Sequence, residues 1–347
     1  MKKKNILNLI KYHFEDNDTA FRDEAYGIAA EFNRNGDGEL AERILSYMSD
    51  RTAFVPQTDT YHSDFLVEAK PANRSLYLPD VIMEDLRGII VAADYNRGVN
   101  RFLFEGSPGT GKTESVKQIA PILKRRVYTV NFDSLIDSRL GQTSKNIAEL
   151  FEEINSMPRR ESAIVLFDEI DALAMDRTNS RDLREMGRAT TAVIRGLDNL
   201  NDSTLVIATT NLFSGFDRAF IRRFDKVVNF NRYTSEDLIF VAEKITDEML
   251  KKFNMTGKNT RLLNKILSLM DPIPYPGELY NLIRTSVAFS DPNKEADYLS
   301  RMMKEIRPDL LTSPESLREA GFTLREMECL THIPKTTLSR ELSGGKS

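Results

Sequence analysis

The stretch RFLFEGSPGTGKTESVKQIAPIL, residues 101–123, decides the fold class of this chain. RFLFE at 101–105 is an apolar run typical of a buried strand, and ESVKQIAPIL at 114–123 has the apolar spacing of a helix. Between them, GSPGTGKT at 106–113 fits the pattern Gly-x-x-x-x-Gly-Lys-[Ser/Thr]. A glycine-rich loop that leads from a strand into a helix can surround phosphate groups with backbone N–H donors. The stretch therefore predicts a phosphate-binding loop.

The candidates for nucleotide binding are the eight residues of this phosphate loop and the residue that follows it. They are Gly106, Ser107, Pro108, Gly109, Thr110, Gly111, Lys112, Thr113 and Glu114. The Lys112 ammonium has the reach to contact β- and γ-phosphates, and the Thr113 hydroxyl is a suitable ligand for Mg²⁺. The motif therefore predicts binding of a nucleoside polyphosphate together with Mg²⁺.

Strand-like and helical segments alternate from about residue 81 to residue 232. Apolar runs typical of strands lie at 101–105, 127–132, 163–167, 204–209 and 226–230. The segments between these runs have the apolar period of helices. This alternation predicts an α/β fold in which helices cover both faces of a parallel sheet.

Two acidic residues follow the third of these strands, in AIVLFDE at 163–169. We expect Asp168 to hold Mg²⁺ and Glu169 to activate an attacking water as a general base. A protein that only bound nucleotide would not need such a base. The pair therefore predicts hydrolysis.

Composition narrows the class of protein further. The 347 residues carry 48 Lys and Arg against 52 Asp and Glu, a net charge of −4, which argues against a globally basic nucleic-acid binder. A single cysteine excludes a disulfide scaffold, and three histidines far apart in the chain argue against a histidine-rich metal centre. No apolar run approaches the roughly 18 residues of a membrane span, and the basic start is not followed by a signal peptide. We expect a cytoplasmic protein without membrane contact.

With these motifs in this order, the region 76–305 resembles an AAA ATPase, a ring-forming branch of the phosphate-loop fold. ATTN at 208–211 is similar to the family's first sensor, which implies that Asn211 reads the γ-phosphate. FDRAFIRRFD at 216–225 is similar to the second region of homology, which implies that Arg222 and Arg223 are paired arginine fingers for a neighbouring subunit. The resemblance implies ATP and ADP as ligands, Mg²⁺ as cofactor and a homo-oligomer, usually a hexamer.

Taken together, pattern and resemblance predict five segments. They are an N-terminal helical bundle at 1–50, a linker at 51–75, the AAA α/β domain at 76–232, a helical lid at 233–308 and a helix-turn-helix-like segment at 309–347. The bundle has the size of a unit that docks a protein partner, and a bracing module without a partner is an equal alternative.

The chain departs from the family pattern at two positions. Glu278 follows Gly277 where an arginine would act as a second sensor, so that sensor is expected to be absent. In SRLGQTSKNIAELF at 138–151, Arg139 stands where an aromatic residue would grip a threaded polypeptide, which argues against processive threading. Glu185 and Arg188 resemble residues that link neighbouring subunits, and for them a simple structural contact is an equal alternative.

Asn131, at the end of the second strand, resembles a residue that restrains the catalytic glutamate, again with a structural contact as the alternative.

The C-terminal segment FTLREMECLTHIPKTTLSREL, 322–342, is similar to a helix-turn-helix of the resolvase or transposase type. Its second helix would present Lys335, Thr336, Thr337, Ser339 and Arg340 to DNA. The net charge of the segment is only about +1. A helical hairpin that packs on the lid or mediates assembly is therefore the alternative.

The predicted function is a Mg²⁺-dependent AAA ATPase that works as a ring to remodel or regulate a macromolecular partner. The alternative is an ATP-switched DNA-binding regulator, or an antitoxin-like partner of an effector such as a protease in a bacterial defence or plasmid-maintenance system. A third hypothesis, a protein unfoldase fed by the N-terminal bundle, is disfavoured by Arg139.

Overall fold

The computed structural model describes residues 3–14, 63–72, 75–95, 97–136, 142–157, 160–173, 180–292 and 294–344, and eight positions between 21 and 32. The chain divides into two compact units, 1–62 and 63–347. In the first unit, helix α1 (Lys3–Phe14) contacts the helical positions that follow it. Asn8 Nδ2 donates to Glu24 Oε2 at 3.1 Å, and Ala25, Ile28 and Ala29 are buried. The part of the predicted bundle from residue 33 to residue 50 lies outside the described residues.

The second unit begins with a six-stranded sheet and the helices that cover it. The strands are β1 (Leu66–Glu68), β2 (Arg101–Glu105), β3 (Arg126–Val130), β4 (Ala163–Phe167), β5 (Leu205–Thr210) and β6 (Lys226–Asn229). The helices are α4 (Asp80–Asp94), α5 (Lys112–Ile122), α6 (Phe132–Leu135), α7 (Gln142–Ser156), α8 (Ser180–Asp198) and α9 (Arg218–Ile221). Short 3₁₀ turns lie at Arg160–Ser162, Ile170–Leu173 and Phe213–Gly215.

The strand order is β1-β3-β4-β5-β2-β6, and every neighbouring pair is parallel except β1 with β3. Because β2 lies between β5 and β6, the loop after β2 opens beside the end of β5. Ligands of open parallel sheets bind at the carboxyl ends of the strands, where the order of the strands reverses. This topology therefore places the phosphate loop beside the residues that follow β4 and β5.

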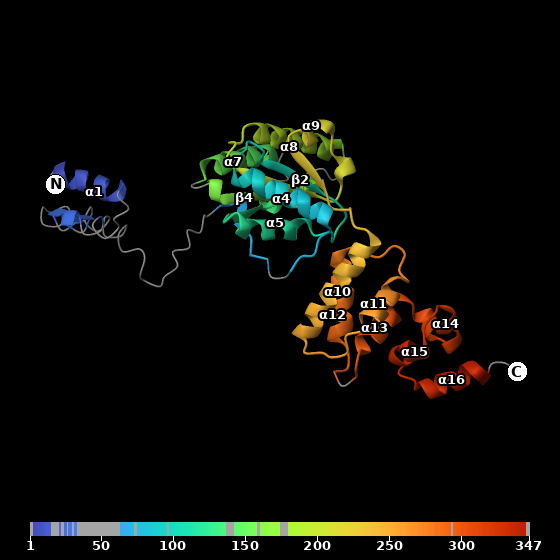
Figure 1. Ribbon diagram of the computed structural model, residues 1–347. Helices are drawn as coiled ribbons and strands as arrows, with labels where there is room; N and C mark the ends of the chain where they lie inside the picture. The colour runs from blue at the N-terminus through green and yellow to red at the C-terminus, as the bar shows by residue number, and fades with distance from the viewer. Residues whose placement is uncertain are drawn as a thin grey trace. The chain divides into compact units, whose positions relative to one another are not determined.

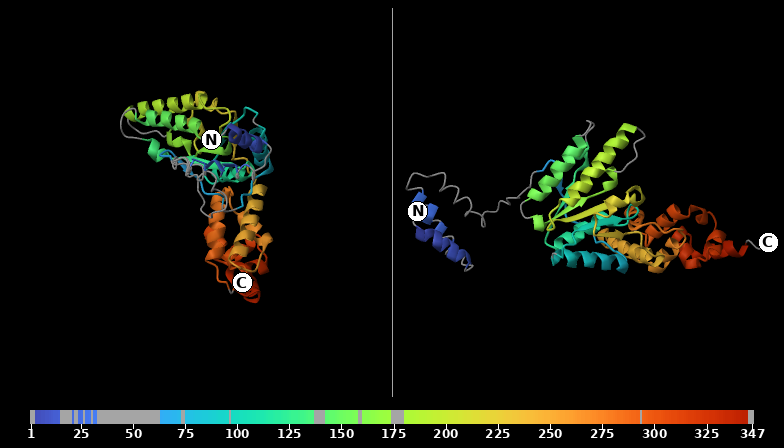
Figure 2. Two further views of the ribbon diagram at one scale, coloured as in Figure 1. Left: turned by 90° about the vertical axis from the view of Figure 1, so that its left-hand side faces the viewer. Right: turned by 90° about the horizontal axis from the view of Figure 1, so that it is seen from above.

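Helices cover both faces of this sheet, as the alternation of elements predicts (Figure 1). Alternate strand residues such as Phe102, Phe104 and Ile164 pack with α4 and α5 in one buried cluster. On the opposite face, the ring of Phe151 in α7 stacks on Phe167 of β4 with 5.8 Å between centroids. Figure 2 shows the strands between the teal helices α4 and α5 and the green helices α7 and α8.

The predicted strands are confirmed to within one or two residues, and two differences have local causes. The run expected at 127–132 ends as a strand at Val130, because Asn131 caps α6 by accepting the N–H of Asp133 at 3.1 Å. The sheet is also not purely parallel. β1, inside the segment 51–75 predicted to be a linker, pairs antiparallel with β3 at the edge, where a three-residue strand is tolerated among prolines.

The helical remainder contains α10 (Ser235–Lys252), α11 (Thr260–Leu267), α12 (Pro276–Ala288), α13 (Asp297–Ile306), α14 (Pro314–Glu319), α15 (Leu324–Thr331) and α16 (Lys335–Gly344). A 3₁₀ turn, Pro308–Leu311, precedes α14. One buried cluster extends from Leu238 in α10 to Leu338 in α16. We call α10–α13 the lid and α14–α16 the C-terminal hairpin. The hairpin shares the core of the lid and is not an appended module with a core of its own.

Candidate nucleotide site

The phosphate loop has a backbone that only glycine adopts without strain. Gly109 and Gly111 have φ values of +78° and +98°, and Gly111 ends the loop as the N-cap of α5. Gly109 also approaches the lid closely, because the N–H of Gly277 donates to its carbonyl at 2.8 Å. A Cβ built on Gly277 would lie 2.7 Å from the Cα of Gly109. The loop therefore meets the lid backbone to backbone.

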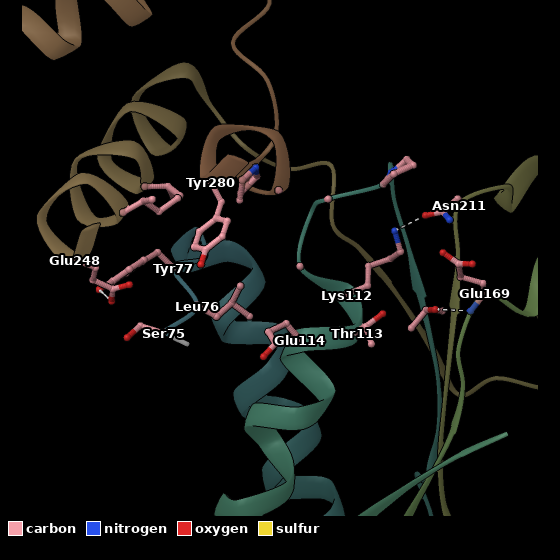
Figure 3. Close-up of a pocket in the computed structure, with 18 residues that line it drawn as sticks. Ser75, Leu76, Tyr77, Lys112, Thr113, Glu114, Glu169, Asn211, Glu248 and Tyr280 are labelled. Carbon is pink, nitrogen blue, oxygen red and sulfur yellow. Dashed lines mark hydrogen bonds between the residues drawn. The ribbon is translucent and has the colours of Figure 1, made fainter. Parts of the chain in front are cut away.

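Lys112 extends along the inside of this loop and is 7 % exposed. Its Nζ donates to the carbonyls of Gly106 at 2.7 Å and Ser107 at 2.9 Å, and to Oδ1 of Asn211 at 2.8 Å. An ammonium has three donors, and here all three are used. Because the ammonium can only donate, Asn211 turns its amide oxygen to Lys112 and keeps its NH₂ group for another acceptor (Figure 3).

Burial lowers the pKa of Lys112, and the carboxylates of Asp171, Asp168 and Glu169 oppose that shift. Asp171 is itself 5 % exposed and accepts the N–H of Asn211 through Oδ1 at 3.3 Å. The ammonium thus lies between loop carbonyls and an acidic strand edge. Phosphate groups that bind here would compete with those internal acceptors for its protons.

Asp168 and Glu169 leave β4 with different surroundings. Oδ1 of Asp168 accepts the hydroxyls of Thr113 at 2.6 Å and Thr209 at 2.7 Å. Glu169 is exposed to the pocket, and its backbone is left-handed, with φ of +54°. That conformation costs a residue other than glycine about 1 kcal/mol. The N–H of Glu169 donates to Oγ1 of Thr209 at 2.9 Å.

The other end of the pocket is formed by segments that are far apart in the chain. Three segments contribute three lining residues each. The segment before α4 provides Ser75, Leu76 and Tyr77, α10 provides Val241, Ile245 and Glu248, and α12 provides Pro276, Gly277 and Tyr280. The hydroxyl of Tyr77 donates to Oε1 of Glu248 at 2.7 Å and so joins the first of these segments to the lid. This hydrogen bond, more than any other cause, raises the pKa of Tyr77.

The pocket between loop and lid has a volume of about 250 Å³ (Figure 3). Among the described residues that line it, Lys112 is the one cationic side chain. Glu278 lies outside this lining and is exposed, so α12 supplies no cation where a second sensor would lie. A nucleoside triphosphate carries several negative charges, so Lys112 alone leaves much of that charge without a partner.

The two candidate finger arginines have different environments. Arg222 is exposed at the C-terminus of α9 and is not among the residues lining the pocket of its own chain. Arg223 contacts Asp198, the last residue of α8, with Nε–Oδ1 at 2.9 Å and Nη2–Oδ2 at 3.1 Å. Arg223 also donates through Nη1 to the carbonyl of Ala219 at 3.3 Å, so its guanidinium is engaged within its own chain.

Two further candidates that the structure describes, Asn131 and Arg188, do not line the pocket. The side chain of Asn131 caps α6 and donates to Ser134 Oγ at 2.9 Å, so it is engaged away from Glu169. Arg188 is exposed on α8. The side chain of Glu185, also in α8, and the whole of Arg139 lie outside the described residues.

The residues present fit a nucleotide and Mg²⁺. A Cβ on Gly106 would lie 3.0 Å from Phe230 and 3.3 Å from the hydroxyl of Thr110, so the loop is a cradle closed to side chains. Thr113 and Asp168 offer hard oxygen ligands. Within the described residues there is no group of three or more His, Cys, Asp or Glu that could hold a metal ion. Mg²⁺ is commonly held by one or two protein oxygens together with substrate phosphates, and Thr113 and Asp168 provide oxygens of that kind.

The family profile described as "ATPase family associated with various cellular activities (AAA)" matches residues 102–232. The chain carries an AAA-family ATPase domain. The match runs from β2 through β6 and therefore contains the phosphate loop, the acids after β4, Asn211 and both arginines.

Relatives of this AAA domain include the AAA family ATPase y4kL of Sinorhizobium fredii, 38% identical over 133 residues, which are 38% of this chain and 39% of that protein. A putative 26S proteasome regulatory subunit homologue of Methanothermobacter thermautotrophicus is 30% identical over 149 residues, 42% of this chain and 39% of that protein. The peroxisomal ATPase PEX6 of Cricetulus griseus is 27% identical over 320 residues, 88% of this chain and 32% of PEX6. The chain thus spans about two fifths or less of these relatives.

A chain of the solved Escherichia coli MS115-1 HORMA:CdnC:Trip13 complex has the same fold, with a TM-score of 0.55 and 17% identity. The alignment covers 67% of this chain and 89% of that chain. Within the described residues, no helix is both long and apolar enough to cross a bilayer.

Sequence reasoning missed several residues that the structure brings to the AAA site. Thr209 and Asp171 each lie two residues from a predicted site residue, Asn211 and Glu169 respectively, yet neither has a role of its own predicted from the sequence. Tyr77 and Glu248 are separated by 171 positions and meet only because the lid folds over the loop. The single local signal was the Gly-Glu-Leu-Tyr run at 277–280, which contains Tyr280 of the pocket.

Proposed function

We propose that this chain is a Mg²⁺-dependent ATPase that assembles into a ring, a hexamer, and remodels a macromolecular partner in the cytoplasm. One observation carries the proposal: Lys112, Asn211, Asp168 and Glu169 converge at the carboxyl ends of β2, β4 and β5, beside a phosphate loop. Two relatives are named as a proteasome regulatory subunit homologue and a peroxisomal ATPase. These names favour the remodelling of a partner as the process that ATP hydrolysis drives.

Each residue has a chemical role in this proposal. The N–H groups of the loop and Lys112 bind the phosphates, and Thr113 and Asp168 would hold Mg²⁺, which neutralises phosphate charge. Glu169 takes a proton from the attacking water, while the NH₂ group of Asn211 orients that water and the γ-phosphate. Binding of ATP frees Lys112 from at least one of its three internal acceptors.

The ring supplies the cation that a single chain lacks. Lys112 is the one cationic side chain among the described residues of the pocket, and Arg222 is exposed outside it. A guanidinium delivered by a neighbouring subunit would complete the charge balance of the transferring phosphoryl group. This charge deficit supports an oligomer, with Arg222 and Arg223 both in the segment that faces the neighbour's ATP.

The test of this function is Glu169→Gln, which keeps the shape of the side chain and removes the base. We expect ATP binding to persist while turnover falls by about 100-fold or more. The ATP-bound ring should also become longer-lived in light scattering. Lys112→Ala should abolish ATP binding, and Glu161→Gln, an exposed acid at the other end of β4, serves as the control. Unchanged turnover in Glu169→Gln would overturn the assignment of the base.

A second candidate function is an ATP-switched DNA-binding regulator, including the antitoxin-like role. The observation that favours it is the arrangement of α15 and α16, joined by a turn at 332–334. Leu338 faces the core, whereas Lys335, Thr336, Thr337, Ser339 and Arg340 are exposed. A second helix that presents basic and hydroxyl side chains is typical of DNA-reading helix pairs.

Duplex DNA separates the two candidates. A regulator predicts ATP turnover that responds to DNA and loses that response in Lys335→Ala with Arg340→Ala. Lys251→Ala with Lys252→Ala, two exposed lysines at the end of α10, is the matched control. Point variants are preferable to truncation, because Leu317, Met327 and Leu330 of the hairpin belong to the lid core. Absence of any DNA response would leave a protein partner, with the N-terminal unit as its docking site.

A further inference from the structure

Thr209 lies between the two acids of the candidate site. It is the fifth residue of β5 and is 1 % exposed. The parallel register pairs Phe167 of β4 with Ala208 of β5, so the residues that follow them, Asp168 and Thr209, are also neighbours. The Thr209 hydroxyl therefore lies where β4 ends and the acidic pair begins.

The hydrogen bonds of this hydroxyl have only one consistent direction. Oγ1 of Thr209 accepts the N–H of Glu169 at 2.9 Å, and because a hydroxyl has a single proton, that proton goes to Oδ1 of Asp168 at 2.7 Å. One side chain thus binds the backbone of the candidate base and the carboxylate of the candidate metal ligand. The dashed line beside Glu169 in Figure 3 marks the first of these bonds.

Glu169 and Asp168 each have a geometry that a hydrogen bond to Thr209 would help to hold. Glu169 has a left-handed backbone, which a residue other than glycine keeps only when its surroundings enforce it. Asp168 receives the hydroxyls of Thr113 and Thr209 on the same oxygen, Oδ1, and this orients its second oxygen, Oδ2, away from them. Loss of Thr209 would leave Asp168 with Thr113 as its one remaining hydroxyl donor on Oδ1 among the described contacts.

We propose that Thr209 is a positioning residue that sets the metal-binding carboxylate of Asp168 and the base Glu169 in one fixed geometry. The inference rests on the proposed function for the roles of these two acids. Packing alone would be served equally well by valine, which has the same shape. Among the side-chain contacts of the described residues, it is the Thr209 hydroxyl that joins β5 to the backbone of Glu169.

The chain offers a matched control in the same strand region. Thr204 directly precedes β5 and is also 1 % exposed, and its buried hydroxyl has no hydrogen-bond partner among the residues that the structure describes. Thr204→Val therefore removes a buried hydroxyl without removing a hydrogen bond, whereas Thr209→Val removes two. Thr209→Ser keeps the hydroxyl and should restore what Thr209→Val loses.

Two measurements on the full chain test the proposal, and the first needs neither nucleotide nor metal. In hydrogen–deuterium exchange, the peptide containing Glu169 should exchange about 10-fold faster in Thr209→Val and remain unchanged in Thr204→Val. In the second, Thr209→Val should lower kcat for ATP by about 10- to 100-fold, because a misplacement of about 1 Å at the reacting groups has that effect. Affinity for a non-hydrolysable ATP analogue without Mg²⁺ should stay within about 2-fold of wild type, whereas the gain in affinity on adding Mg²⁺ should shrink.

The outcomes separate this inference from the proposed function. Exchange and kcat at wild-type values in Thr209→Val would overturn the positioning role. The positioning role would also be wrong if Thr209→Ser, with an unchanged melting temperature that shows it to be folded, failed to restore wild-type exchange and kcat. If Glu169→Gln kept full turnover, the proposed base would be wrong, while faster exchange in Thr209→Val would still establish the bond.

Discussion

The α/β part and the helical part of the second unit use buried polar groups for opposite purposes. In the α/β part, β4 and β5 are buried along their whole length, and the polar groups gather where these strands end and the pocket begins. There, Lys112 donates its three hydrogen bonds to two loop carbonyls and to Asn211, and the phosphates of a bound nucleotide would replace these acceptors. The polar groups at this site therefore have hydrogen-bond partners that a ligand can displace.

In the helical part, polar side chains connect one helix to another. Lys265 of α11 binds Glu326 of α15 at 2.9 Å and the carbonyl of Gly321 at 2.6 Å, and its Nζ lies 4.4 Å from the ring centroid of Phe322. Asp297 of α13 accepts from Arg301 at 3.0 Å and contacts Nε2 of His332 at 2.8 Å. The contacts of Lys265 with Glu326 and of Asp297 with His332 join the C-terminal hairpin to the lid. Buried, hydrogen-bonded polar groups therefore indicate a candidate functional site in this chain only where a pocket lies beside them.

The largest effect should come from the finger segment of the α/β part. Arg222→Ala should lower turnover by about 1000-fold, because a guanidinium supplied in trans contributes at least that much in phosphoryl transfer. Mixing Arg222→Ala chains with Glu169→Gln chains should restore part of the activity. An interface in which the Arg222→Ala chain supplies the base and the Glu169→Gln chain supplies the arginine has both groups intact, whereas the reverse interface has neither. ATP turnover of mixtures against mixing ratio is the measurement. Two inactive variants that never complement each other would contradict a finger in trans.

Arg223 and Arg222 are adjacent in the same segment, but they should differ in how they depend on Asp198. Because Arg223 is held by Asp198, Arg223→Ala and Asp198→Ala should lower turnover to a similar extent, and the double variant should be no worse than either. Arg222→Ala should instead add fully to Asp198→Ala. Additive losses for Arg223 and Asp198 would show that the ion pair has no part in placing the segment.

A smaller effect, on stability alone, is expected in the helical part. Leu330 of α15 is 1 % exposed within the lid core, so Leu330→Ala should lower the free energy of unfolding by about 2–5 kcal/mol. Urea denaturation measures the loss, and Leu324→Ala, at 37 % exposure on the same helix, is the control. If Leu330→Ala lost no stability, the hairpin would be an independent module and the two parts would differ less than described.

The smallest effect depends on pH. Burial would raise the pKa of Asp297, but hydrogen bonds from the N–H of Asp291, from Arg301 and from His332 outweigh it and hold the pKa below the usual 3.8. A carboxyl with a lowered folded pKa stabilises the fold above its unfolded pKa and loses that stabilisation as pH falls through the folded value. Asp297→Asn should therefore lower the free energy of unfolding by about 1–3 kcal/mol near pH 7.

That difference should shrink below pH 3.8, where Asp297 itself becomes protonated in the wild type. Thermal melts of the two proteins across this range are the measurement. Asp309→Asn, which breaks a surface pair with Arg307, should show no measurable change at any pH. A penalty for Asp297→Asn that persisted unchanged into strong acid would mean that the charge of Asp297 does not stabilise the contact between lid and hairpin.

The amino-acid sequence by itself determined most of the secondary-structure elements and pointed to the residues of the candidate phosphate site. Five strands were predictable to within one or two residues, because apolar runs of this length between helical periods have few other solutions. The loop 106–113 and the acids after β4 were predictable because their function depends on neighbours in the chain.

Only the tertiary structure decided how these pieces meet. The edge strand β1, the hydrogen bonds of Thr209, the pairing of Arg223 with Asp198 and the contact of Tyr77 with Glu248 all join positions that no local pattern relates. Of the three helices of the hairpin, α15 and α16 are predicted by the segment 322–342, whereas α14 is not, and the packing of all three into the lid core follows from which apolar faces remain to be covered. Local periodicity specifies which face of a helix is apolar, whereas the partner of that face is set by the packing of the whole unit.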